Sequence, residues 1–172
     1  MKLKQSARLT IALLLAVGLL RANNDDVSDR ASLKGLAGVF VIVDLNPEIE
    51  RYGITSRTIQ ADLESRLRQA GIRILTQAEW KTWSLAPGTP WLYVGVQAHR
   101  AGLPGSYAVA THVKLMQTVV LMRDMQTTSV TSTWNVDRIG FFNKGRVDVI
   151  RDAMKDLTNE FINAYQSVNP TK

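Results

Sequence analysis

Hydrophobic and polar residues alternate along much of the second half of the chain. The stretch from Tyr107 to Asp137 predicts a long β-hairpin, because alternate residues of each arm are mostly apolar, as in strands with one buried face. Its connection is expected at Arg123 to Gln126. Trp91 to Arg100 alternates in the same way and predicts another strand. Leu36 to Asp44 is almost continuously apolar, which predicts a strand covered on both faces or nearly so.

Apolar residues spaced three and four apart predict two long helices. The first begins at Thr55 or Ser56 and ends near Ala70, and the second runs from Arg146 to Ser167. Their apolar stripes are Ile59, Leu63, Leu67 and Ala70 in the first helix, and Val147, Ile150, Met154, Leu157, Phe161 and Tyr165 in the second. Between these helices, residues 72–75 predict a short strand and residues 78–83 a short helix.

Together these elements predict an α+β fold, namely a two-layer sandwich with a mixed sheet of about five strands and two long helices on one face. The strand–helix–strand order of residues 36–75 predicts a βαβ unit with parallel strands and a right-handed crossover. We expect a single domain over residues 33–170. The sheet face away from the helices would be open or covered by a partner.

The N-terminus has the layout of a secretory signal peptide over residues 1–22. Basic residues precede a short apolar run, Leu9 to Leu20, and cleavage after Ala22 is expected. The protein would then be periplasmic or secreted, without an integral membrane span; an uncleaved segment that anchors it to the inner membrane is the alternative. Residues 23–32 (NNDDVSDRAS) are polar and acidic, so we expect a disordered leader there.

Charge and cysteine content exclude several classes of protein. Four of the 21 Lys and Arg residues precede residue 23, which leaves 17 basic against 15 acidic residues, a net charge of +2. We therefore expect no nucleic-acid partner. The absence of cysteine excludes disulfides, thiolate metal sites and a lipoprotein anchor.

Candidate catalytic residues are scarce. His99 and His112 lie on predicted strands, but no HxH or HExxH spacing supports a metal site, and no G-x-S-x-G turn presents a serine nucleophile. We predict no catalytic residue, no metal and no cofactor. A binding module is favoured over an enzyme.

Aromatic residues give the clearest candidate site. Trp80, Trp83 and Trp91 surround a loop that contains Pro87, Gly88 and Pro90, and Tyr93 follows closely. One interpretation is an apolar cluster beneath the loop. The other is an aromatic platform that binds a peptide, a glycan or a partner surface, since Trp and Tyr dominate binding hot spots.

Several segments resemble a family of small exported bacterial proteins of unknown function. They are AGIRILTQAEW, PGTPWLYVGV, the stretch from Gln117 to Arg123, TSTWNV and EFINAYQSVNP, spread over Leu33 to Pro170. The order of elements is also similar to the TolB amino-terminal domain and to curli-secretion and penicillin-binding-protein-activator lipoproteins. This second likeness is in topology only, and a shared topology implies no particular function.

We therefore expect a non-enzymatic envelope or secreted accessory module that binds a protein or a polymer. The alternative is a small-molecule-binding protein or hydrolase with a site near the loop from Trp83 to Trp91. His99 or His112 beside a carboxylate would serve that alternative.

The position of the mature N-terminus tests the export prediction. Mass spectrometry of the protein recovered after export should give a chain that begins near Asn23. An intact Met1 would instead favour the anchored form.

Overall fold

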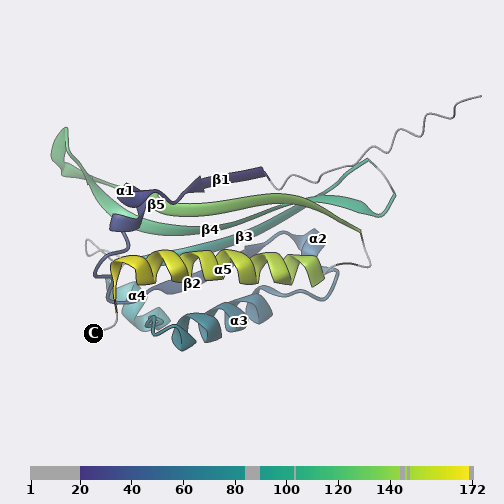
Figure 1. Cartoon of the computed structure of the whole chain (residues 1–172), viewed down its shortest axis with the longest axis horizontal. Coiled ribbons are helices and arrows are strands. Elements are labelled where there is room, and N and C mark those ends of the chain that lie inside the picture. Colours follow the sequence, from purple (N-terminus) through teal and green to yellow (C-terminus); the bar gives the residue numbers. More distant parts are fainter. Residues whose placement is uncertain (1–19, 84–89, 103, 144–145, 147, 171–172) are drawn as a thin grey trace, which may run out of the picture.

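A mixed sheet forms the centre of the molecule (Figure 1), for which the computed structural model describes residues 20–83, 90–102, 104–143, 146 and 148–170. Five strands lie in the order β1-β5-β4-β3-β2. Their bounds are β1 (Leu20–Asn24), β2 (Phe40–Leu45), β3 (Trp91–Arg100), β4 (Ser106–Leu121) and β5 (Asp124–Asn143). Only the β2–β3 pair is parallel, and the other three pairs are antiparallel.

The helices are α1 (Val27–Ala31), α2 (Pro47–Glu50), α3 (Ser56–Gln69), α4 (Gln77–Trp83) and α5 (Asp148–Val168). The two longest, α3 and α5, contact each other, and they also contact β2 and the β4–β5 pair respectively. The predicted α+β class with a mixed sheet is confirmed. No helix among the described residues is both long enough and apolar enough to cross a bilayer.

One face of the sheet supplies the core. Strand register aligns Val43, Val94, Val113 and Val136 across β2, β3, β4 and β5. In the next row Trp134 is fully buried and packs edge-on against Phe161 of α5, with ring centroids 5.3 Å apart. These side chains form one cluster with the buried stripes of α3 and α5. Alternation in the strands and periodicity in the helices thus serve the same core.

The predicted strand at residues 72–75 is wrong. Only Ile74 bridges Val39, with Val39 N donating to Arg73 O at 2.9 Å and Leu75 N donating to Val39 O at 2.9 Å. The segment is apolar because Ile72 and Leu75 are buried in the core, each 2% exposed. The β-strand pattern therefore reflects burial of a connecting segment, and the parallel crossover runs from β2 through α3 to β3.

The expected disordered leader at residues 23–32 is also wrong. β1 pairs with β5, and Asp26 caps α1 through bonds from Ser28 N and Asp29 N. The carboxylate of Asp25 accepts hydrogen bonds from the Arg30 guanidinium and, at 2.8 Å, from the indole N–H of buried Trp134. The polar residues of this segment thus have specific partners, which composition alone does not reveal.

These contacts determine the charge state of Asp25. Its burial alone would raise the pKa, but the hydrogen bonds from Arg30 and Trp134 outweigh that effect and lower the pKa below the usual value. The carboxylate is therefore ionised at neutral pH and satisfies an indole donor that would otherwise be buried without a partner. Asp25 ties the N-terminal segment to the core.

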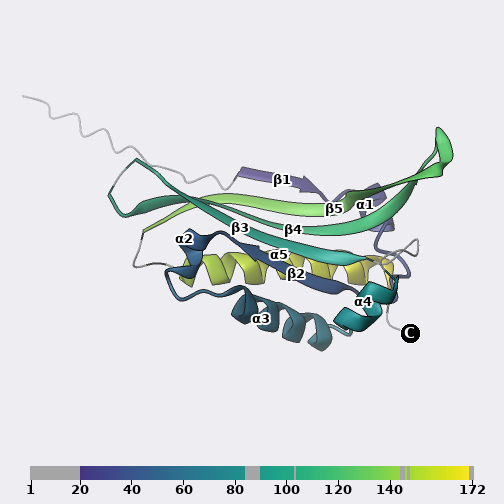
Figure 2. The same cartoon turned by 180° about the vertical axis from the view of Figure 1, so that it is seen from behind.

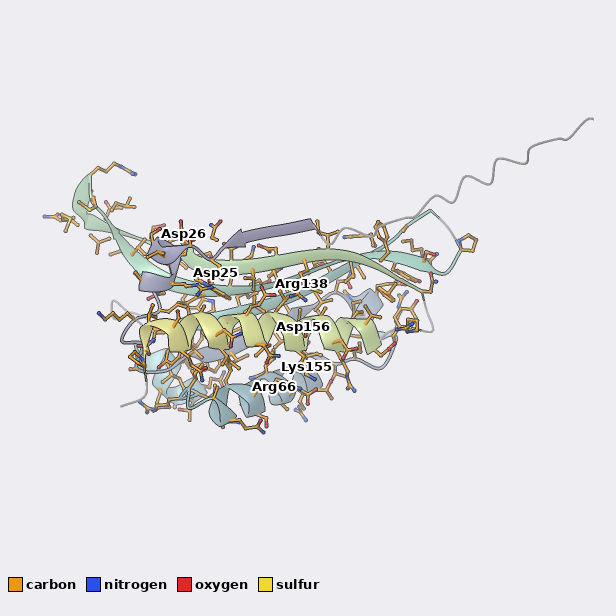
Figure 3. The ribbon with its side chains drawn as sticks, viewed as in Figure 1. Asp25, Asp26, Arg66, Arg138, Lys155 and Asp156 are labelled. Carbon is orange, nitrogen blue, oxygen red and sulfur yellow. The ribbon has the colours of Figure 1, made fainter. Side chains whose placement is uncertain are left out.

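A second ionic contact ties α5 to the sheet. Arg138 of β5 has a side chain only 11% exposed, and it pairs with Asp156 at 3.2 Å (Figure 3) and also with Glu160. Both carboxylates lie on one side of α5, one turn apart. The guanidinium therefore fixes the rotation of α5 against β5.

β4 and β5 form a ribbon that extends well beyond the other strands (Figure 1). The predicted hairpin is confirmed, but its turn lies at Met122 and Arg123 rather than at Arg123 to Gln126, and β5 continues to Asn143. A register shift between Leu115 and Met116 marks where the ribbon leaves the core. Beyond it, every residue from Met122 to Thr131 is exposed.

Truncation of the helix stripe tests the core assignment. Leu157 is fully buried, so Leu157→Ala should lower the free energy of unfolding by about 2–5 kcal/mol through lost burial and the cavity left behind. Urea unfolding followed by circular dichroism measures the change. Lys155→Ala on the exposed side of α5 is the matched control and should lie within about 0.5 kcal/mol of wild type. A similar small decrease of the free energy of unfolding in both variants would contradict the placement of Leu157 in the core.

Candidate functional site

The face of the sheet turned away from α5 (Figure 2) is referred to below as the open face. It carries the residues that alternate with the core positions, and strand register places them in rows. The first row contains Phe40, Trp91 and Met116. The second contains Ile42, Tyr93, Lys114 and Asn135, and the third contains Asp44, Gly95, His112 and Asp137.

Aromatic side chains gather at one end of the open face. Phe40 stacks on Trp80 of α4, with centroids 4.9 Å apart and planes 16° apart, and Trp80 meets Trp91 edge-on at 6.2 Å. All three rings are half-buried. Tyr93 lies on the same face, one row from Trp91. Three of the four residues proposed from sequence, Trp80, Trp91 and Tyr93, are thus grouped at one end of this face.

The side chain of the fourth residue, Trp83, is not among those that the structure describes. Residues 84–89 of the adjoining loop also lie outside the described residues. The alternative site near the loop from Trp83 to Trp91 falls largely in that stretch. The described part of the site is therefore the sheet surface from Phe40 to Asp137.

Tyr93 connects the aromatic end to the polar rows. Its hydroxyl donates to Asp44 Oδ2 at 2.7 Å, and its ring stacks on His112 with centroids 5.4 Å apart. The hydrogen bond to Asp44, with partial burial and the charge of that carboxylate, raises the pKa of Tyr93. The phenol is therefore a neutral donor, and its ring is held over the middle strands.

His112 lies flat across Gly95 on the neighbouring strand. A Cβ added to Gly95 would lie 2.2 Å from His112 Nε2, so only glycine admits the imidazole in this position. Burial, and next the positive charge of Lys114, lower the pKa of His112. The Nε2 atom is buried and has no hydrogen-bond partner among the described residues. His112 is therefore neutral at pH 7 and completes a small stack with Tyr93.

Carboxylate, amide and ammonium groups border this stack. Asn135 Nδ2 donates to Asp137 Oδ2 at 2.6 Å, and Lys114 Nζ lies 3.9 Å from Asp137 Oδ1. Together with Asp44 on the other side, these side chains place hydrogen-bond donors and acceptors around a flat, partly apolar surface. This is the composition of a binding surface rather than of a charged groove.

His99 points to the same face but does not meet His112. It lies opposite Ala108, whereas His112 lies opposite Gly95, four residues earlier on β3. No group of three or more His, Cys, Asp or Glu side chains that could hold a metal occurs among the residues that the structure describes.

Sequence reasoning missed Asp44, Lys114, Asn135 and Asp137. They belong to three different strands, and only the register brings them beside Tyr93 and His112. Gly95 was a usable signal, since a glycine within an alternating strand often marks a close approach by a neighbouring group. The partner that approaches could not be identified from spacing.

Comparison with known proteins gives a distant structural likeness. No protein-family model and no curated protein matches this chain. Two crystal forms of the PelC dodecamer from Paraburkholderia phytofirmans, one with a single substitution, are similar to it at 13% sequence identity. Their TM-scores are 0.44 and 0.43, over 83% and 86% of this chain and 95% and 96% of PelC. Function must therefore be argued from the chain's own residues.

The neutral state of His112 predicts a pH dependence of stability. The unfolded chain protonates this histidine near pH 6.5, whereas the folded chain resists protonation, so stability should fall as the pH decreases through that value. Between about pH 7.5 and about pH 5.5, the free energy of unfolding measured with urea should decrease less for His112→Phe than for wild type. Val27→Ala, which changes no titratable group, is the control and should keep the wild-type dependence of stability on pH. An equal decrease of the free energy of unfolding in wild type and His112→Phe would contradict the interpretation that the His112 ring is buried and neutral.

Proposed function

We propose that this chain is a non-enzymatic binding module of the cell envelope or of the secreted fraction. In this proposal the open face of the sheet binds a partner protein or polymer. The two-layer arrangement supports it, because both long helices pack into the core on the other face. The basic and then apolar N-terminus supports export of the chain.

One observation carries the proposal. Phe40, Trp80, Trp91 and Tyr93 gather on a sheet surface that the long helices leave free, although aromatic rings of this size contribute most to stability when covered. Half-buried Trp and Tyr side chains beside organised polar groups are typical of the central residues of interfaces. A ligand laid over this surface would cover the rings and meet Asp44 and Lys114 at their border.

The state of the histidine supports binding over catalysis. A general base must reach the proton that it removes, directly or through one water molecule. The buried Nε2 atom of His112 presents no accessible surface from which to do so. Its ring instead packs against Tyr93 and Gly95, which favours a role in shaping the surface.

Substitution of the central tryptophan tests the proposed surface. The purified chain would be immobilised and exposed to envelope extract, to peptidoglycan fragments and to a panel of polysaccharides. For any ligand that it retains, Trp91→Ala should weaken binding by about 2 kcal/mol or more, roughly thirtyfold. Titration calorimetry measures the affinity.

Two matched variants separate binding from folding. Trp91→Phe keeps an aromatic ring and should lose less affinity than Trp91→Ala. Val27→Ala removes an apolar side chain that is 88% exposed and lies away from the open face, so it should bind as wild type does. Retention of no ligand at all, or equal affinity of Trp91→Ala and wild type at equal folded fraction, would refute the proposal.

A further inference from the structure

Exposed apolar side chains gather at the two ends of the β4–β5 ribbon. Among the described residues, the large hydrophobic side chains that water reaches most are Val27, Val120, Met122, Met125, Val130, Ile139 and Phe141. All of them except Val27 belong to this ribbon or its turn. Four lie at the turn end and two near the other end, far apart along the longest dimension of the molecule (Figure 1).

The first group defines the arm tip, which consists of Val120, Met122, Arg123, Asp124, Met125 and Val130. Met122 is 92% exposed and Met125 is 70% exposed. Val120 faces Thr128 and Val130 faces Thr118, so the two valines are diagonal neighbours on one side of the ribbon. Apolar surface presented in this way on a projecting ribbon is typical of a contact surface.

The arm tip also carries a fixed charge. Asp124 accepts hydrogen bonds from Thr127 Oγ1 at 2.5 Å and from Gln126 N at 3.1 Å. These bonds lower the pKa of Asp124, the one from Thr127 contributing most. The tip therefore presents an ionised carboxylate between two methionines, with Arg123 beside it.

Phe141 of the second group borders a hollow at the opposite end of the ribbon, referred to below as the end hollow. It has a volume of about 430 Å³ and is lined by Ala101, Ser106, Phe141, Phe142, Asn143, Arg146 and Val149. Phe141 is 63% exposed. Arg146 stands at the rim with Asp148, 3.4 Å away, and both side chains are largely in water.

We propose that the arm tip of one copy of this chain docks into the end hollow of a second copy. The methionines meet Phe141 and Val149, while Asp124 meets Arg146 and Arg123 meets Asp148. The charges are complementary in both pairs, and the hollow has the size of small-ligand sites, which is about 300–1,000 Å³. The contact uses none of Phe40, Trp80, Trp91 and Tyr93, the aromatic residues on which the proposed function rests, so it is independent of that function.

The geometry defines the kind of assembly. One chain cannot place its own tip into its own hollow, because the two lie at opposite ends of a rigid ribbon (Figure 1). The contact is therefore heterologous, and repeated use of it produces a ring if the rotation closes or a filament if it does not. A lipid surface is a poorer occupant for the tip, because it would desolvate the ionised Asp124 without supplying the guanidinium that Arg146 offers in the end hollow.

Self-association of the full mature chain tests the proposal. Sedimentation velocity over a range of concentrations should show species larger than a monomer. The tip variant, Met122→Ser with Met125→Ser, and the hollow variant, Phe141→Ser with Arg146→Glu, should each weaken association by roughly tenfold or more. Val27→Ser, which removes the exposed side chain outside both groups, should associate as wild type does.

A mixture of the two variants distinguishes this contact from others. The hollow variant keeps an intact tip and the tip variant keeps an intact hollow, so together they should form a one-to-one heterodimer and no larger species. A symmetric contact made by two tips would instead persist in the hollow variant alone, whose tip is intact, and would not require the tip variant.

Three results would overturn the proposal. They are a wild-type chain that stays monomeric up to about 1 mM, association that survives in either variant alone, and a monomer whose tip binds vesicles of phosphatidylethanolamine and phosphatidylglycerol. Circular dichroism and the unfolding midpoint of each variant establish that the fold is intact.

Discussion

Burial of one side of the sheet against α3 and α5 is the interaction on which the rest of the structure depends. Side chains of a strand alternate between faces, so placing Leu92, Val113 and Val136 in the core also determines every residue between them. A slip of one residue would expose the core and bury the charged rows. The same register that fills the core therefore places Tyr93 against His112, and the open face is as strongly specified as the interior.

The sequence predicted the elements that have a strong and regular period. Alternation over residues 91–100 indicated β3, and apolar stripes indicated α3 and α5 close to their observed bounds. It failed where a segment takes its structure from distant partners. Asp25 is 109 residues from the indole that it binds, and no local pattern encodes that contact. Residues 72–75 looked like a strand because burial and strand formation leave the same apolar signature.

The residues of the candidate site show the same difference between local patterns and distant partners. Trp80 and Trp91 are near one another in the chain and could be grouped from composition, whereas Asp44, His112 and Asp137 share a row that only strand register creates. Gly95 links the two kinds of information. Its missing side chain is visible in the sequence, but the imidazole that fills the space belongs to β4. Flat surfaces built by sheets are for this reason harder to anticipate than sites formed by short motifs.

β1 has a consequence for the export proposed above. It spans Leu20–Asn24, so a signal peptidase that cuts after Ala22 would remove most of this strand. The precursor and the processed chain would then differ in topology, since β5 would change from an internal strand to an edge with unpaired amide and carbonyl groups facing water. Under the proposal of export, cleavage at that point would therefore release a hydrogen-bonding edge that β1 otherwise occupies.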